Sequence, residues 1–304
     1  MSTENRRTDH SGLKRGTLIR GVGSFYTVSD DEHTEYTVRC KKKFRHQKIT
    51  PLVGDEVLFS PGEGEEHGWL EEILDRKTVC LRPPVANVTM LVIVIAPVPE
   101  PDLLLTDRQI ARAAGQGIKV LLVVNKKDLD PLYAETIRKE FAGSGIPVLN
   151  VSALEKTGLE TLRETLTGEL CCFTGQSGAG KSTLLNALLD LDLETGDISR
   201  RISRGKNTTR HSVLIERNGI RVMDTAGFNL LEPENELEPE QLKDRYHEFA
   251  AYEGQCRFRE CMHDREPGCA VRQAAEAGKI SAGRLRRYQL LLKEIREAWR
   301  ERYD

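Results

Sequence analysis

The chain has 304 residues, more than one average domain holds, so two or three domains are expected. Its 45 Lys and Arg residues nearly balance 47 Asp and Glu residues, which excludes a uniformly basic nucleic-acid-binding protein and requires any such contact to come from a local patch. No apolar run reaches the roughly 18 residues of a membrane span, and the chain begins with a polar segment, so we expect no membrane association, no signal peptide and a cytoplasmic location.

Residues 1–13 are polar and charged and are expected to form a disordered arm. Residues 14–85 hold short alternating runs broken by Gly, Asp and Pro, which predict strands at 17–19, 25–28, 36–38, 56–59 and 69–74. So many short strands in one small segment predict a closed β-barrel of the OB kind, a fold that binds oligonucleotides through one face and its loops.

A basic segment falls between two of these strands. It includes Phe44, an aromatic ring on which a base can stack. We expect the segment to contact RNA, with a merely solvated loop as the alternative. The residues expected to bind RNA are Lys41, Lys42, Lys43, Arg45 and Lys48.

From residue 86 to 235 the pattern changes to continuous apolar runs separated by helical stretches. These runs lie at 90–95, 120–124, 148–151 and 171–173. Strands that are apolar on both faces are typical of a mostly parallel sheet covered by helices. The sequence therefore predicts a central α/β domain.

A phosphate-binding loop follows the strand at 171–173 and opens a helix. Its glycines let backbone N–H groups surround phosphates, Lys181 reaches the β- and γ-phosphates as a catalytic group, and the Ser182 hydroxyl ligates Mg²⁺. The residues expected to bind the phosphates are Gly175, Gln176, Ser177, Gly178, Ala179, Gly180, Lys181, Ser182 and Thr183.

A guanine-reading loop, Asn125, Lys126, Lys127 and Asp128, follows the strand at 120–124. The Asp128 carboxylate accepts from both N1–H and the exocyclic amine of guanine, whereas adenine would leave it unpaired. This disfavours an ATP-using phosphotransferase, which is one alternative function.

Ser152 and Ala153 follow the next strand and fit the second base-contacting loop, with the Ala153 N–H meeting guanine O6. Both base loops precede the phosphate loop, the reverse of the order in an ordinary GTPase. The chain is therefore predicted to be a circularly permuted GTPase.

Asp224 and Gly227 belong to an Asp-x-x-Gly loop, in which the carboxylate holds Mg²⁺ through water and the glycine N–H senses the γ-phosphate. Thr208 or Thr209 is expected to complete the magnesium shell, and a glycine-rich basic loop without ligands is the alternative.

Phe228 stands where many GTPases carry a glutamine that orients the attacking water. A phenyl ring cannot do this, so slow intrinsic hydrolysis is expected. A partner or another residue, such as His211, would then position the water.

Residues 236–304 are expected to form a helical zinc-binding domain, with a final amphipathic helix from about residue 281. Three thiolates and one imidazole can close a tetrahedral shell around one structural Zn²⁺ per chain. These ligands are Cys256, Cys261, His263 and Cys269. Basic residues around them are expected either to contact phosphates or to form a solvated helix face, namely Arg257, Arg259, Lys279, Arg284, Arg286 and Arg287.

The order of these motifs, between an OB-like region and Cys-x4-Cys-x-His-x5-Cys, resembles the small-ribosomal-subunit-dependent GTPases of the RsgA family. The resemblance implies a cytoplasmic bacterial GTPase that binds GTP or GDP, the 30S subunit and 16S rRNA late in assembly, and carries zinc in its last domain. We expect a monomer.

Two residues depart from the family pattern: Asn207, where a histidine is usual, and Ala226, where a proline is common. Any catalytic part played by that histidine is therefore not carried over to this chain. The alternative function is a nucleotide-gated RNA-binding module in which hydrolysis only resets binding.

Overall fold

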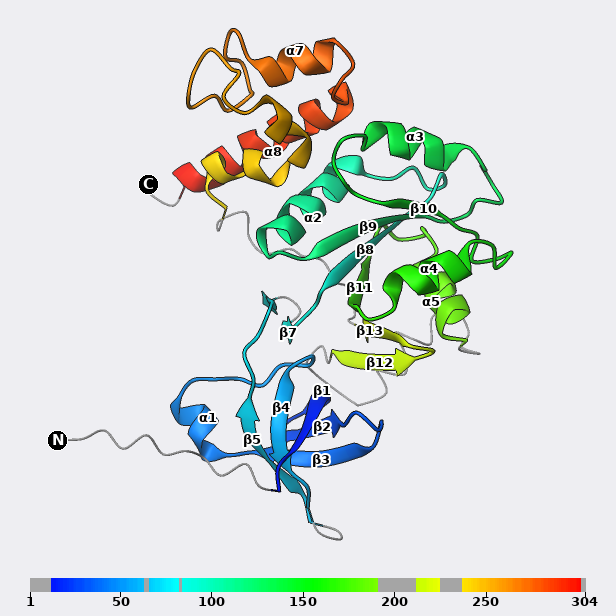
Figure 1. Ribbon diagram of the computed structural model, residues 1–304, viewed down its shortest axis with the longest axis vertical. Helices are drawn as coiled ribbons and strands as arrows, with labels where there is room; N and C mark the ends of the chain where they lie inside the picture. The colour runs from blue at the N-terminus through cyan, green and yellow to red at the C-terminus, as the bar shows by residue number, and fades with distance from the viewer. Residues whose placement is uncertain (1–11, 63–65, 82–83, 191–211, 225–236, 302–304) are drawn as a thin grey trace, which may run out of the picture.

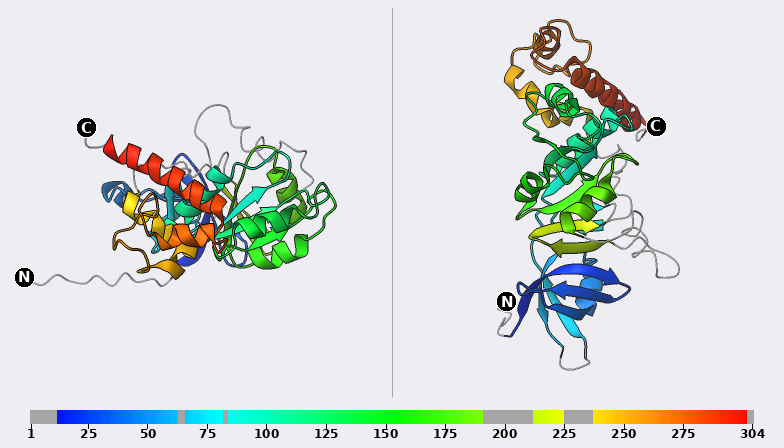
Figure 2. Two further views of the ribbon diagram at one scale, coloured as in Figure 1. Left: turned by 90° about the horizontal axis from the view of Figure 1, so that it is seen from above. Right: turned by 90° about the vertical axis from the view of Figure 1, so that its right-hand side faces the viewer.

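The computed structural model describes residues 12–62, 66–81, 84–190, 212–224 and 237–301, and of Arg45, Leu81 and Asp224 it describes the backbone alone. The molecule is elongated, with a β-barrel at one end, a helical unit at the other and an α/β unit between them (Figure 1). The view at right angles shows the same order along the long axis (Figure 2).

The barrel consists of β1 (Lys14–Val22), β2 (Phe25–Ser29), β3 (Glu35–Cys40), β4 (Glu56–Ser60) and β5 (Gly68–Ile73). These strands pair in the order β1-β2-β3-β5-β4, and β1 also pairs with β4, which closes the barrel. Alternate residues such as Val28, Val38 and Leu70 fill the interior. The predicted OB-like barrel is confirmed.

A short helix, α1 (Lys42–His46), lies between β3 and β4 in the segment expected to bind RNA. It turns Phe44 into the barrel core, where the ring is 4% exposed. The expectation that this ring stacks on a base is therefore wrong. One turn of helix buries the single apolar residue of the segment and leaves Lys42 and Lys43 outside.

The central unit is a sheet with the strand order β10-β9-β8-β11-β13-β12. Its strands are β8 (Met90–Ile95), β9 (Lys119–Val124), β10 (Val148–Asn150), β11 (Leu170–Thr174), β12 (Val213–Arg217) and β13 (Ile220–Asp224). Among the described strands of this unit, only β12 runs antiparallel to its neighbour β13, so the predicted mostly parallel sheet is confirmed.

Helices cover both faces of this sheet. Helices α2 (Leu103–Gly115) and α3 (Tyr133–Glu140) pack on one face, and α4 (Leu159–Leu166) and α5 (Lys181–Leu189) pack on the other. All six residues of β8 are buried, because alternate side chains enter the two cores.

The barrel and the central sheet are hydrogen-bonded into one eleven-stranded sheet. The connection is a single residue pair, Arg20 of β1 with Val213 of β12. A small ribbon of β6 (Val79–Leu81) and β7 (Pro84–Ala86) lies between β5 and β8 in the chain. This connection was not predicted from the sequence.

The C-terminal unit contains three 3-10 helices, η2 (Pro239–Gln241), η3 (Lys243–Arg245) and η4 (His247–Tyr252), followed by α7 (Ala270–Glu276) and α8 (Ala282–Arg300). Ser281 caps α8 by accepting from the Arg284 N–H at 3.1 Å. The predicted apolar face is buried through Leu285, Tyr288, Leu291, Leu292 and Ile295.

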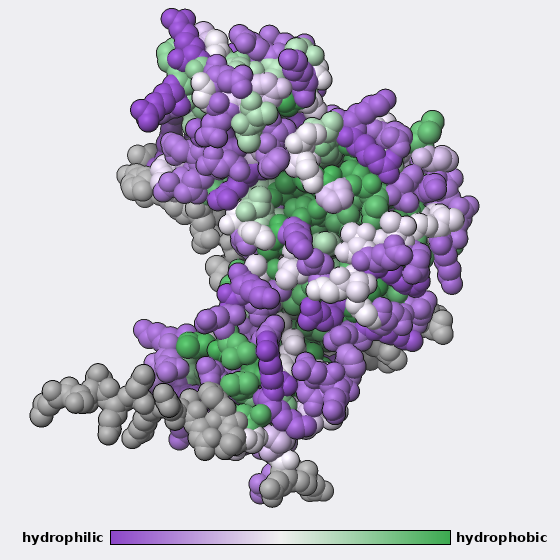
Figure 3. All heavy atoms as spheres, viewed as in Figure 1, coloured by the Kyte–Doolittle hydropathy of each residue, from purple (hydrophilic) through white to green (hydrophobic). Residues whose placement is uncertain are grey.

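Helix α8 lies against α2 of the central unit, and residues of both helices share one hydrophobic core. Hydrophilic residues cover most of the outer surface of this end in the view of Figure 3. None of the helices among the described residues has the length and apolarity needed to cross a membrane.

Candidate nucleotide-binding site and metal centre

The phosphate loop connects β11 to α5 and passes close to β8. Gly175 has a positive φ of 137°, and a Cβ there would lie 2.0 Å from the Val94 carbonyl oxygen. Gly180 also has a positive φ, and a Cβ there would meet the Asn125 amide nitrogen at 2.4 Å. No side chain fits at either position, so both glycines are needed for the loop to reach this conformation.

Lys181 is half-buried at the start of α5. Its ammonium donates to the carbonyl oxygens of Gly175 at 2.5 Å and Gln176 at 3.1 Å. Burial lowers the pKa of this ammonium from its ordinary value. A lysine in this position brings a positive charge inside the loop, where anionic phosphate oxygens would offset the cost of its desolvation.

Asn125 joins three loops through one buried side chain. Its amide nitrogen donates to the Ala179 carbonyl of the phosphate loop at 3.0 Å, and its amide oxygen accepts from the Ala153 N–H at 3.0 Å. Segments that lie about fifty residues apart in the chain therefore meet at a single residue.

Asp128 lies beside the second base loop. The buried Ser152 hydroxyl donates to its carboxylate, which holds the acceptor oxygens in one orientation. Lys126 has a positive φ of 62° and donates to the Val98 carbonyl oxygen at 2.7 Å. This arrangement fixes the acceptor oxygens of Asp128, as the predicted guanine contact requires.

Helix α2 contributes two contacts to the phosphate loop that the sequence did not indicate. Gln176 of the loop accepts from the backbone N–H of Asp102, the residue that caps α2, at 3.1 Å. Gln109 of α2 donates to the Thr174 hydroxyl, just before the loop, at 2.9 Å. No local sequence pattern indicates either hydrogen bond, because the two residues that form it are at least 65 positions apart in the chain.

Several predicted residues lie outside what the structure describes. Thr208, Thr209, His211 and Gly227 belong to the undescribed segments, and of Asp224 only the backbone at the end of β13 is described. Ser182 and Thr183 lie in the first turn of α5, next to Lys181.

The four predicted metal ligands of the C-terminal unit come together. Their ligand atoms all lie within 4.8 Å of one another, and the Nδ1 atom of His263 is 3.7 Å from Sγ of Cys256 and 3.4 Å from Sγ of Cys269. A tetrahedral zinc ion with ordinary bond lengths separates sulfur and nitrogen ligands by about 3.6 Å. The residues Cys256, Cys261, His263 and Cys269 therefore fit one such ion.

The surroundings of the cluster suit thiolate ligands. The backbone N–H groups of Ala270 and Arg272 point to Sγ of Cys256 and Cys269 at 3.3 and 3.5 Å. Burial acts against the thiolate at Cys261, because it raises the pKa of this thiol to about 12, so that a bound cation is needed to displace the proton. Burial also lowers the pKa of His263, which keeps the imidazole neutral and able to ligate.

Two of the arginines expected near phosphates have another role. Arg284, 1% exposed, pairs with Asp107 of α2 at 2.5 Å and with Glu248 at 2.7 Å. Arg287 pairs with Asp107 at 2.5 Å and with Glu140 of α3 at 2.6 Å. Arg284 and Arg287 therefore neither bind phosphate nor form a solvated helix face, so both expectations for them are wrong. Their ion pairs attach α8 to the α/β unit.

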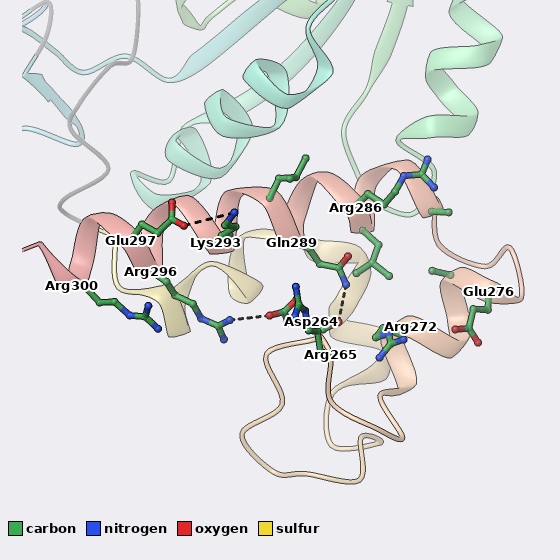
Figure 4. Close-up of a pocket in the computed structure, with 14 residues that line it drawn as sticks. Asp264, Arg265, Arg272, Glu276, Arg286, Gln289, Lys293, Arg296, Glu297 and Arg300 are labelled. Carbon is green, nitrogen blue, oxygen red and sulfur yellow. Dashed lines mark hydrogen bonds and ion pairs between the residues drawn. The ribbon is translucent and has the colours of Figure 1, made fainter.

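Arg286, by contrast, faces a groove of about 1050 Å³ along α7, α8 and the loop between His263 and Cys269 (Figure 4). Two of the groove's basic side chains are paired, Arg296 with Asp264 at 3.0 Å and Lys293 with Glu297 at 3.8 Å. The basic residues that line the groove are Arg265, Arg272, Arg286, Lys293, Arg296 and Arg300.

The lysines of the barrel lie at its surface. Lys41 pairs with Glu71 of β5 at 2.5 Å, and Lys42, Lys43 and Lys48 are exposed. The basic segment is therefore accessible, although the side chain of Arg45 is outside what the structure describes.

The strand order, a phosphate loop after the central strand β11, and base loops that precede it in the chain define a circularly permuted P-loop GTPase. The RsgA GTPase family model matches residues 73–234, and the RsgA N-terminal domain model matches residues 15–70.

Curated relatives and solved structures agree with these matches. "Small ribosomal subunit biogenesis GTPase RsgA" of Ruminiclostridium cellulolyticum is 40% identical over 296 residues, which is 94% of this chain and 95% of the relative. The protein of that name from Geobacillus sp. (strain WCH70) is 41% identical over 293 residues, which is 94% of this chain and 98% of the relative.

Among solved structures, YjeQ from Thermotoga maritima matches with a TM-score of 0.80 at 32% identity, covering 93% of this chain and 98% of its own. YloQ, described as a circularly permuted GTPase, matches with a TM-score of 0.78 at 30% identity, covering 96% and 98%. The chain belongs to the RsgA GTPase family, and its predicted fold class and GTPase activity are confirmed.

Proposed function

We propose that this GTPase acts in biogenesis of the small ribosomal subunit, binding the 30S particle through 16S rRNA and hydrolysing GTP late in assembly. The observation that carries the proposal is the contact of Asn125 with Ala179 and Ala153, which joins the base loops to the phosphate loop. The chain is also about 40% identical to a protein named for small-ribosomal-subunit biogenesis. Assembly of ribosomes would place the protein in the cytoplasm, where we expect it to act as a monomer.

GTP would bind with its guanine against Asp128 and its phosphates in the loop that contains Lys181. Magnesium prefers hydroxyl and carboxylate oxygens, and we expect Ser182, Asp224 and either Thr208 or Thr209 to supply them. The ion would offset negative charge on the phosphates during hydrolysis. Gly227 would sense the γ-phosphate.

Zinc would act as a structural ion in the C-terminal unit. The four side chains of the cluster would take all four donor positions of a tetrahedral ion, so no position would be left for a substrate. A segment with so few apolar residues gains much of its folding free energy from such an ion.

The decisive experiment measures GTP hydrolysis by the full-length chain with and without 30S subunits, with 50S subunits as the particle control and Lys181→Ala as the inactive variant. We expect slow hydrolysis alone, stimulated at least tenfold by 30S subunits, because Phe228 cannot orient water. Equal rates with 30S and 50S particles would contradict the proposal.

The alternative, a nucleotide-gated binding module in which hydrolysis only resets binding, predicts a different result. In that case GTP rather than GDP would tighten 30S binding, while 30S subunits would leave the hydrolysis rate unchanged. The same preparation, assayed by pelleting through sucrose, separates the two functions.

A further inference from the structure

Three side chains form a row across the outer face of the barrel. Phe25 of β2 is the cross-strand partner of Arg39 of β3, and Arg39 is the partner of Trp69 of β5. Cross-strand partners point to the same face of a sheet. Their neighbours Val38 and Leu70 are buried in the barrel, so the row faces outward.

The row is an aromatic and cationic surface that no described element covers. Trp69 is 45% exposed, and the guanidinium of Arg39 lies 4.4 Å from the centroid of the Phe25 ring. The imidazole of His67 also contacts this ring in an edge-on arrangement, with the two ring centroids 4.8 Å apart and the ring planes at 74°. These contacts hold the Phe25 ring and the Arg39 guanidinium in place before any ligand binds, and Trp69 lies beside them.

The row continues into the basic segment. Lys41 follows Arg39 by two residues on the same face, and its partner Glu71 follows Trp69 by two residues. The pair is internally neutral, so Glu71 does not repel an anion beside Trp69. Helix α1 begins at Lys42 and adds exposed ammonium groups at this end of β3.

We propose that Phe25, Arg39, Trp69 and His67 form a stacking platform for unpaired bases of an RNA strand whose phosphates lie along the lysines of α1. Bases stack on aromatic rings and guanidinium planes regardless of sequence, while nearby cations hold the backbone. Bases inside a duplex already stack on each other and present no free face. The platform therefore selects single-stranded RNA.

This inference deepens the proposed function, since it identifies which RNA structure the barrel would bind. The expected aromatic contact moves from Phe44, which is buried, to Phe25 and Trp69, which lie in two of the strands predicted from the sequence. We propose RNA rather than a protein as the ligand, because a dense cluster of cations lies next to the aromatic row.

The test uses the full-length chain with Trp299→Phe, so that Trp69 is its single tryptophan. Titration with a mixed-sequence RNA of about 12 nucleotides should quench Trp69, and the same strand annealed to its complement should bind at least tenfold more weakly. The variants Trp69→Leu and Phe25→Leu, measured by anisotropy of labelled RNA, should each lose about tenfold in single-strand affinity, whereas Trp69→Phe should stay within about twofold.

The matched control is Phe258→Leu in the C-terminal unit, because Phe258 is 46% exposed beside Arg257, whose guanidinium lies 5.6 Å from the ring. Its RNA affinity should equal that of the parent. If Trp69→Leu and Phe25→Leu bind RNA with unchanged affinity while Lys42→Glu binds it more weakly, the platform is overturned. RNA would then contact the lysines and not the aromatic rings.

Two further outcomes separate this inference from the proposed function. If RNA fails to quench Trp69 while 30S subunits still stimulate hydrolysis, the platform is wrong and the proposed function stands. If Trp69→Leu weakens 30S binding but not RNA binding, the surface contacts a ribosomal protein, which also overturns the inference.

Discussion

Single side chains of the candidate nucleotide-binding site each contact more than one loop. Ser152 shows this at its simplest, because its buried hydroxyl donates to the Asp128 carboxylate across the two base loops. Without that donor the carboxylate would lose the orientation in which we expect it to accept from guanine.

Ser152→Ala should therefore weaken GDP binding about tenfold, since a hydrogen bond to a charged group contributes about 1.5–3 kcal/mol. Weak ATP binding should not change, because adenine does not use the carboxylate. Calorimetric titration of both nucleotides checks this, with the neighbouring exposed residue in Leu154→Ala as control. A parallel loss for GDP and ATP would mean that the loop itself had moved.

At the scale of elements, α8 is attached to α2 and α3 by a buried ion-pair network. Arg284 provides the centre, between Asp107 and Glu248. Arg284→Met would leave the buried Glu248 carboxylate without its cation and Asp107 with Arg287 alone, which should lower the free energy of unfolding by about 3–5 kcal/mol. Urea titration followed by Trp299 fluorescence in a Trp69→Phe background measures this.

Arg286→Met is the control for that experiment, because Arg286 is exposed on the same helix. Its effect should stay within about 0.5 kcal/mol. Equal effects of the two substitutions would show that the buried network does not stabilise the attachment.

The metal cluster, also an element-scale feature, should bind zinc with a strong pH dependence. Burial raises the pKa of Cys261 to about 12 and also raises the pKa of Cys269, so both thiols hold protons at neutral pH until a cation displaces them. Zinc binding then releases protons and must weaken as the pH falls.

Between about pH 8 and about pH 6.5 the zinc affinity should fall at least tenfold per pH unit, because at least one proton is released per ion bound. Competition with a chromophoric chelator measures the affinity, and Cys80→Ser, outside the cluster, serves as control. An affinity that did not vary with pH would contradict thiolate ligation by these residues.

At the scale of the whole molecule, the barrel joins the α/β unit through one residue pair of a continuous sheet. Arg20 and Val213 are partners there, and Val213 begins the strand that leads by a hairpin to Asp224. Partner residues of antiparallel strands have Cα atoms about 4.5–5.5 Å apart, within the range that a disulfide spans.

Arg20→Cys combined with Val213→Cys should therefore cross-link rapidly under mild oxidation, visible as a mobility shift on a non-reducing gel. Arg20→Cys with Ile215→Cys should not, because that diagonal separation is about 7–8 Å. Cross-linking of both pairs at the same rate would show that the two units move freely at this junction.

The sequence by itself determined everything that depends on local pattern and spacing. Continuous apolar runs such as residues 90–95 could only be strands buried on both faces, and Lys181 and Asp128 stood in motifs whose backbone conformation is encoded by neighbouring glycines and strand ends. The order of those motifs was enough to predict the permuted fold, because connectivity is a property of the chain itself.

Only the tertiary structure decided which surface each side chain occupies. The sequence predicted Arg284 to be solvated or to bind phosphate, but it pairs with acidic side chains of α2 and η4. The sequence predicted Phe44 to be an exposed ring, but one helical turn buries it in the barrel core. Cross-strand partners such as Phe25, Arg39 and Trp69 become neighbours through pairing of strands far apart in the chain. Such contacts join residues with no shared local pattern, so their physical cause is the packing of the whole fold.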